Sequence, residues 1–137
     1  MQRTYLAYQQ NQVMTAPGEK LVLMLFEGLC KFTKSALISC RDGDIEHTSN
    51  NLVKAEAILS ELISSLNPEV EISENLAVVY GYMYRRLVEA NVQKDADLID
   101  EIHNMAVELR DTWLQAAASE NGEAEHCYEK KGVSALG

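Results

Sequence analysis

The hydrophobic and polar positions of this chain follow a helical period through most of its length. Between residues 45 and 66, apolar side chains return every three or four positions, and the same spacing runs through 74–92 and 96–118. Such spacing places the apolar side chains on one face of an amphipathic helix. Because several of these residues also return every seventh position, the helices are predicted to pack against one another along their length.

Helix-capping and helix-breaking residues predict where the first two helices begin and end. Thr15-Ala16-Pro17 opens the first helix, with Thr15 or Ala16 as the cap and Pro17 in the first turn, where its missing N–H costs nothing. This helix runs to about Arg41. Asp42-Gly43-Asp44 forms a turn and a new cap, so the second helix is expected from Ile45 to Leu66.

The third and fourth helices are bounded by a proline and two further capping residues. Pro68 stops the second helix, because the residue before a proline is pushed out of the helical conformation. Ser73 is the expected cap of a helix from Glu74 to Val92, and Asp95 the expected cap of a helix to about Ala118. The links are only a few residues long, which favours antiparallel neighbours.

These elements predict an all-α fold, an antiparallel up-and-down four-helix bundle with a short N-terminal capping segment. Its domains are an N-terminal cap segment over 1–14, a bundle over 15–118 and a disordered tail over 119–137. The expected seams are Leu21, Leu25, Leu29, Phe32 and Ala36; Ile45, Thr48, Leu52, Ala55, Leu59, Leu62 and Leu66; Leu76, Tyr80, Met83, Leu87 and Ala90; Leu98, Ile102, Met105, Leu109, Thr112 and Ala116.

Six consecutive apolar residues, from Leu21 to Phe26, begin the first long helix. At 3.6 residues per turn they cover its whole circumference, whereas a helix packed on one layer needs an apolar stripe roughly 100° wide. Some of this surface must therefore meet a second layer. That layer could be the N-terminal segment, a second copy of the chain or a separate partner.

Charge and composition narrow the function. Of the 137 residues, 12 are basic and 21 acidic, for a formal charge of -9, which disfavours nucleic acid and anionic membrane surfaces. The one dense basic cluster, Arg85-Arg86, is too small to reverse this. The sequence has no stretch of 18 apolar residues, so we expect no bilayer-spanning helix, and the first residues do not show the pattern of a secretory leader. Three cysteines without C-x-x-C spacing are typical of reduced thiols in the cytoplasm.

Candidate catalytic and metal-binding patterns are weak. The Glu-x-x-His spacing of di-iron bundles occurs at Glu123 in the tail, and on the fourth helix His103 is expected to face solvent. Cys30 and Cys40 are expected as small buried side chains, and His47 as a surface residue. We therefore expect no catalytic residues, no metal and no cofactor, and interpret the chain as a binding protein rather than an enzyme.

The third helix offers a possible binding surface in its tyrosines and arginines. Tyr82 and Tyr84 combine apolar rings with polar tips, which suits recognition of a partner helix, although they could equally cover the bundle while Tyr80 is core. Arg85 and Arg86 could equally be solvated cations that pair with Glu89 one turn on.

Several short stretches, in order and over roughly residues 5–116, resemble the flagellar secretion chaperone FliS family. They are Ala7-Tyr8-Gln9, Thr15-Ala16-Pro17, Leu21 to Gly28, Lys54-Ala55, Leu62, Ser65-Leu66-Asn67, Asn75-Leu76, Tyr82-Met83, Arg85-Arg86-Leu87, Glu89-Ala90-Asn91 and Leu109 to Trp113. The chain departs from the family pattern at Gly81, where an acidic residue is usual, at Gly18, and at Phe26, where tyrosine is frequent.

The resemblance implies a cytoplasmic, non-enzymatic chaperone of flagellin. Its client would be the disordered C-terminal segment of flagellin, kept from premature polymerisation and delivered to the flagellar type III export gate membrane protein. The implied client-binding residues are Leu21, Met24, Leu25, Phe26, Tyr82, Arg85 and Arg86. The N-terminal stretch around Tyr5, Leu6 and Tyr8 would cap the empty groove and dock to the cytoplasmic domain of the gate. The alternative is a self-associating structural bundle without a client, and the free protein could be a homodimer.

Overall fold

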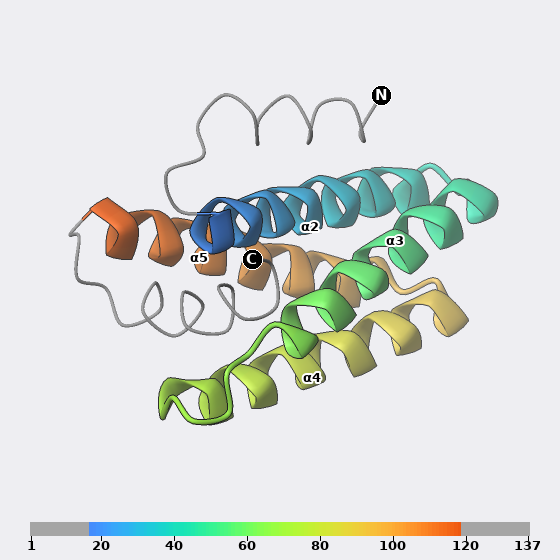
Figure 1. Ribbon diagram of the computed structural model, residues 1–137. Coiled ribbons are helices and arrows are strands. Elements are labelled where there is room, and N and C mark those ends of the chain that lie inside the picture. The colour runs from blue at the N-terminus through green and yellow to red at the C-terminus, as the bar shows by residue number, and fades with distance from the viewer. Residues whose placement is uncertain (1–16, 119–137) are drawn as a thin grey trace.

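Four helices account for nearly all of the chain that the computed structural model describes, residues 17–118. They are α2 (Pro17–Arg41), α3 (Ile45–Ser64), α4 (Ile72–Gln93) and α5 (Ala96–Ala118) (Figure 1). The predicted N-terminal cap segment, with Tyr5, Leu6 and Tyr8, and the predicted tail lie outside the described residues. Among the described helices, none is long and apolar enough to cross a membrane.

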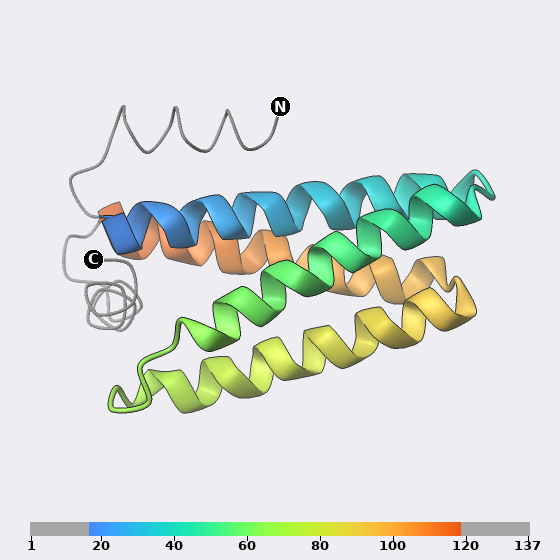
Figure 2. The same cartoon turned by 45° about the vertical axis from the view of Figure 1, so that its right-hand side comes forward.

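Each helix runs antiparallel to the one before it, and the four close into a ring (Figures 1 and 2). α2 packs on α3 and α5, and α4 packs on the same two helices from the other side, so α2 and α4 are diagonal. The predicted up-and-down bundle is confirmed. Figure 2 also shows that the α2–α5 pair and the α3–α4 pair diverge toward the end where α3 finishes and α4 begins.

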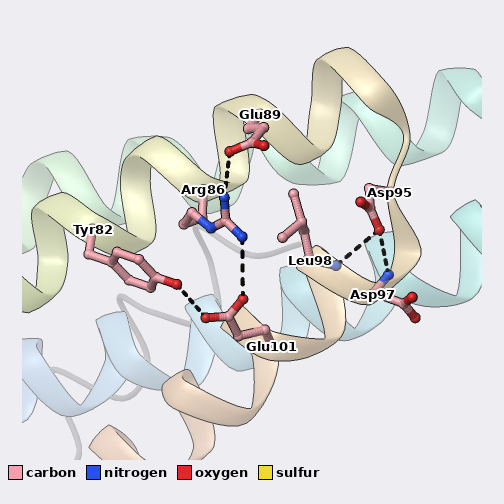
Figure 3. A network of polar contacts seen from close by, with 7 residues as sticks. All are labelled: Tyr82, Arg86, Glu89, Asp95, Asp97, Leu98 and Glu101. Atoms are coloured by element: carbon pink, nitrogen blue, oxygen red, sulfur yellow. Dashed lines mark hydrogen bonds and ion pairs between the residues drawn. The ribbon is translucent and has the colours of Figure 1, made fainter.

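The helix caps agree with the sequence prediction at two sites and differ at a third. The Asp44 carboxylate accepts a hydrogen bond from the His47 amide at 3.1 Å, and Asp95 accepts from the amides of Asp97 and Leu98 (Figure 3). Ser73 is not the cap of α4, because the helix begins one residue before it. The Ser73 hydroxyl instead donates to the carbonyl of Asn67 at 2.5 Å, which ties the α3–α4 connection to the helix.

The core follows most of the predicted seams. Ile45 and Thr112 are exceptions, since both are exposed; Ile45 is the first residue of α3 and directly follows the turn that links α2 to α3. On α5 the buried positions run through Ile99, Ala106 and Trp113, one residue past the predicted seam. The buried apolar residues form one contiguous core: Val22, Phe26, Leu29, Cys30, Phe32, Ala36, Leu37, Leu52, Ala55, Leu59, Leu62, Leu66, Tyr80, Met83, Leu87, Ala90, Leu98, Ile99, Ile102, Ala106 and Trp113.

Three aromatic rings join the diagonal helices through the centre of the core. The Phe26 ring of α2 lies 6.5 Å from that of Tyr80 on α4 and 6.1 Å from that of Trp113 on α5, centroid to centroid. Both distances suit tilted or edge-to-face ring packing. All three side chains are at most 2% exposed, so this cluster holds α2, α4 and α5 at a common level.

A polar contact between α2 and α5 corrects the expectation for His103. Its Nδ1 lies 2.9 Å from the hydroxyl of buried Thr33, so the ring is half-buried in the seam and not turned to solvent. The Thr33 hydroxyl also donates to the carbonyl of Leu29 at 2.7 Å. Burial and the nearby Lys34 ammonium lower the pKa of His103. Burial and the Lys34 charge therefore favour the neutral form of the His103 imidazole in the folded protein.

Candidate functional site

One face of α2 near its start gathers three of the predicted binding residues. Leu21, Met24, Leu25 and Gly28 stand at i, i+3, i+4 and i+7, which places them on one side of the helix. A Cβ atom at Gly28 would lie 2.9 Å from Cδ1 of Ile58, so this side faces α3 at close range. We call these four residues the α2 face.

The six-residue apolar run is divided between the core and this face. Val22 and Phe26 are 2% exposed and belong to the core. Leu25 is partly buried and packs against the core, whereas Leu21 is partly buried without joining the core or the side chains packed on it. Met24 is 7% exposed, so its side chain is buried, although it is not one of the residues of the contiguous core given above. Phe26 therefore contributes to the bundle interior, and Leu21, Met24 and Leu25 to its flank.

Two of the three predicted residues on α4, Tyr82 and Arg86, belong to a polar network with α5 (Figure 3). The Tyr82 hydroxyl donates to Glu101 Oε2 at 2.5 Å, and this bond raises the pKa of Tyr82. The Arg86 guanidinium donates to Glu89 at 2.6 Å, lies 3.9 Å from Glu101 and sits over the Tyr82 ring. The expected pairing of Arg86 with Glu89 is confirmed. The network fixes α4 against α5.

Arg85 stands outside that network. Its side chain is exposed, and one guanidinium nitrogen lies 3.3 Å from the position that a Cβ of Gly81 would occupy. The hydrogen bonds and ion pairs of Tyr82 and Arg86 within residues 17–118 go to α4 and α5, and none joins Tyr82, Arg85 or Arg86 to the α2 face. The structure thus separates the predicted binding residues into two groups.

The cysteine and histidine side chains that were considered for catalysis occupy structural or surface positions. Cys30 is buried, and burial raises the pKa of its thiol. The Cys40 thiol, half-buried, donates to the carbonyl of Lys94 at 3.3 Å, and His47 is exposed beside Asp44. Within residues 17–118, no group of three His, Cys, Asp or Glu side chains could hold a metal ion.

Sequence reasoning missed three residues that shape the surface. Gly28 allows α2 to approach Ile58, and a glycine inside an apolar helical stretch is a usable signal for close packing. Glu101 of α5 joins the polar network of Tyr82 and Arg86 on α4, and predicting this contact would require knowing how α4 and α5 pair. Glu56 is half-buried on α3, one of its carboxylate oxygens has no hydrogen-bond partner within residues 17–118, and burial raises its pKa.

A small all-α bundle that carries an apolar helix face on its flank is a protein-binding scaffold. The family model for "Flagellar protein FliS" matches residues 1–120 of the chain. The chain belongs to the FliS family of flagellar secretion chaperones.

Curated relatives agree with this assignment over most of their length. The chain is 42% identical over 120 residues to the flagellar secretion chaperone FliS of Bacillus subtilis strain 168, covering 88% of this chain and 90% of the relative. The FliS proteins of Campylobacter jejuni and Escherichia coli K12 are 32% and 31% identical, covering 85% and 80% of this chain and 92% and 83% of their own.

Proposed function

We propose that this protein binds the disordered C-terminal segment of flagellin in the cytoplasm, prevents its premature polymerisation and delivers it to the cytoplasmic domain of the flagellar export gate membrane protein. Membership of the FliS family supports a chaperone role and not an enzymatic one. The observation that carries the proposal is the α2 face, where Leu21 and Leu25, both only partly buried, line up beside the buried Met24 on the flank of the bundle.

The energetics suit a client that is unfolded when free. Full burial of a leucine or methionine side chain is worth about 1.5–3 kcal/mol, and partial burial proportionally less. Ordering a disordered segment costs several kcal/mol, so a face of three or four apolar side chains must be nearly dry in the complex. At Gly28 the tip of the Ile58 side chain from α3 occupies the space that a Cβ would fill, so α3 side chains pack against this end of the α2 face.

The other predicted residues have separate roles in this proposal. Phe26 supports the α2 face from below through its packing on Trp113. Tyr82 and Arg86 hold α4 in place through Glu101. Arg85, which is exposed and makes no ion pair with another residue of 17–118, is available to meet a partner. Tyr5, Leu6 and Tyr8 cap the empty face and dock to the export gate; these residues lie outside the described part of the chain.

The test is a calorimetric titration of the full chain with the C-terminal segment of its cognate flagellin. We expect a saturable one-to-one complex. Leu21→Glu and the double variant Leu21→Glu/Leu25→Glu should each weaken it at least tenfold, because each places a charge on a surface that becomes dry. The single variant Leu21→Glu is included because Leu25 also packs against the core, so the double variant could weaken binding by destabilising the fold.

Ile38→Glu is the matched control. Ile38 is a 51% exposed aliphatic residue on the same helix, and it lies off the α2 face. This variant should bind as the unmodified chain does, and circular dichroism should show all variants folded. No saturable association would overturn the proposed function. Unchanged binding by folded Leu21→Glu and the double variant would place the client elsewhere.

A further inference from the structure

The α2 face ends in a pair of lysines. Phe32 stands four residues after Gly28 and seven after Leu25, so it continues the same side of α2 toward the turn into α3. Its side chain is 9% exposed and belongs to the core. The Lys54 ammonium of α3 lies 5.4 Å from the centroid of the Phe32 ring, and the Lys31 ammonium of α2 lies 5.8 Å from it. Two cations from two helices therefore lie beside one ring.

Two contacts fix how α2 and α3 lie along this side of the bundle. Cδ1 of Ile58 lies 2.9 Å from the position that a Cβ of Gly28 would occupy. Four residues further along α2 and four residues earlier on α3, Lys54 lies at Phe32. The offset is the same at both contacts, as an antiparallel pair with equal rise requires (Figure 1). The lysine pair therefore lies about 16 Å along α2 from Leu21.

The two lysines have no anionic partner among residues 17–118. Both side chains are exposed, and neither makes an ion pair, not even Lys31 with Glu27 one turn earlier on α2. The Phe32 ring attracts a cation only through its quadrupole, which is a weak substitute for an anion. A chain of formal charge -9 repels a carboxylate over most of its surface, so two unpaired cations mark a place that attracts one.

The other part of the same side of α3 carries a negative charge. Glu61 follows Lys54 by seven residues, so it stands on the same side of the helix, and it is exposed. The offset of the two contacts places Glu61 level with Leu25 of α2. The N-terminus of an α-helix carries a partial positive charge and its C-terminus a partial negative charge. These charges favour a docked helix whose C-terminal end lies at the lysines.

We propose that Lys31 and Lys54 bind the C-terminal carboxylate of the client segment, so that the client runs parallel to α2 and its chain ends beside Phe32. This assignment rests on the proposed function, in which the client is a segment that ends in a free carboxylate. Both ammonium groups donate to the carboxylate, and apolar side chains earlier in the client cover Leu25 and Leu21. About eleven residues of helix span the distance from Leu21 to Phe32. The lysines thus set the direction of the client, and the leucines supply the apolar contact.

The test is a calorimetric titration of the full chain with two synthetic forms of the flagellin C-terminal segment. One form ends in a free carboxylate and the other in an amide, which removes one charge and leaves every side chain in place. We expect the unmodified chain to bind the amide about tenfold more weakly, because two charged donors lose a charged acceptor. The double variant Lys31→Gln/Lys54→Gln should bind both forms equally, within about twofold.

Lys34→Gln is the matched control. Lys34 is an exposed lysine on the same helix, three residues after Lys31, and it lies near His103 of α5. This variant should keep the tenfold preference for the free carboxylate. Lys31→Arg/Lys54→Arg, which retains both charges, should keep most of that preference as well. Circular dichroism should show every variant folded, because all three lysines are exposed.

Each other result has a distinct meaning. Equal binding of the two forms by the unmodified chain would overturn the carboxylate site and leave the proposed function standing. A double variant that still prefers the free carboxylate would overturn the site too, because the carboxylate then binds elsewhere. Equal weakening of both forms by the double variant would mean that the lysines meet an acidic side chain of the client instead. Failure of both forms to bind would overturn the proposed function and this site together.

Discussion

Replacing Phe26 by alanine tests whether this residue supports the bundle rather than binding the client directly. The side chain is 2% exposed and its ring contacts Tyr80 and Trp113, on the two other helices that it joins. Removing a buried phenylalanine ring costs about 3–5 kcal/mol, from lost transfer free energy and the cavity left behind. Two lost ring pairs, each worth about 0.5–1.5 kcal/mol, favour the upper part of that range.

Urea unfolding followed by circular dichroism measures this loss. With a slope of about 2 kcal/mol per M, the midpoint of Phe26→Ala should fall by about 2 M. Phe26→Leu, which leaves a smaller cavity, should lose less. Val92→Ala, at an 81% exposed position, should stay within about 0.5 kcal/mol of the unmodified chain. A loss for Phe26→Ala as small as that of Val92→Ala would refute the assignment of Phe26 to the core.

Three further predictions test other parts of the fold. Burial and Lys34 lower the pKa of His103, so below about pH 7 the unfolded chain binds more protons than the folded chain does. The free energy of unfolding should therefore fall as the pH drops through 6.5. Unfolding of His103→Gln, measured over the same pH range, should lack this dependence on pH. Gly28→Val should cost about 1–3 kcal/mol in urea unfolding by clashing with Ile58, and Ile58→Ala should partly relieve that loss. The His47 amide lowers the pKa of Asp44, so Asp44→Ala should reduce the melting temperature at pH 7 and much less below pH 3.8, whereas Asp44→Asn should retain most of the cap.

The sequence predicted helix existence and core well because both depend on local pattern. Asp44 and Asp95 are strong capping residues in front of apolar periodicity, and both act as caps. Ser73 had the same local signal but is drawn to the Asn67 carbonyl by the α3–α4 connection, which no local pattern encodes. On α5 the buried residues Ile99, Ala106 and Trp113 keep the seven-residue spacing but lie one residue past the predicted seam, because the rotation of α5 about its axis depends on how it packs against α2 and α4.

The candidate site was less predictable because it depends on how helices pair. The apolar run at the start of α2 is visible in the sequence, but its division into a core side at Phe26 and a flank side at Leu21 follows from the position of α3. Tyr82 and Arg86 were sensible candidates for a binding surface. Their contacts with Glu101 lie across a helix interface, and only the three-dimensional arrangement shows them.

The most direct test of the proposed client site is photocrosslinking from single positions of the folded chain. A photoreactive residue at Leu21 should form a covalent product with the C-terminal segment of flagellin, and the same residue at Asn104, an exposed position on α5, should not. Crosslinking at Leu21 that excess unlabelled segment suppresses is the result we predict. A complex that forms normally yet crosslinks at Asn104 and not at Leu21 would contradict it.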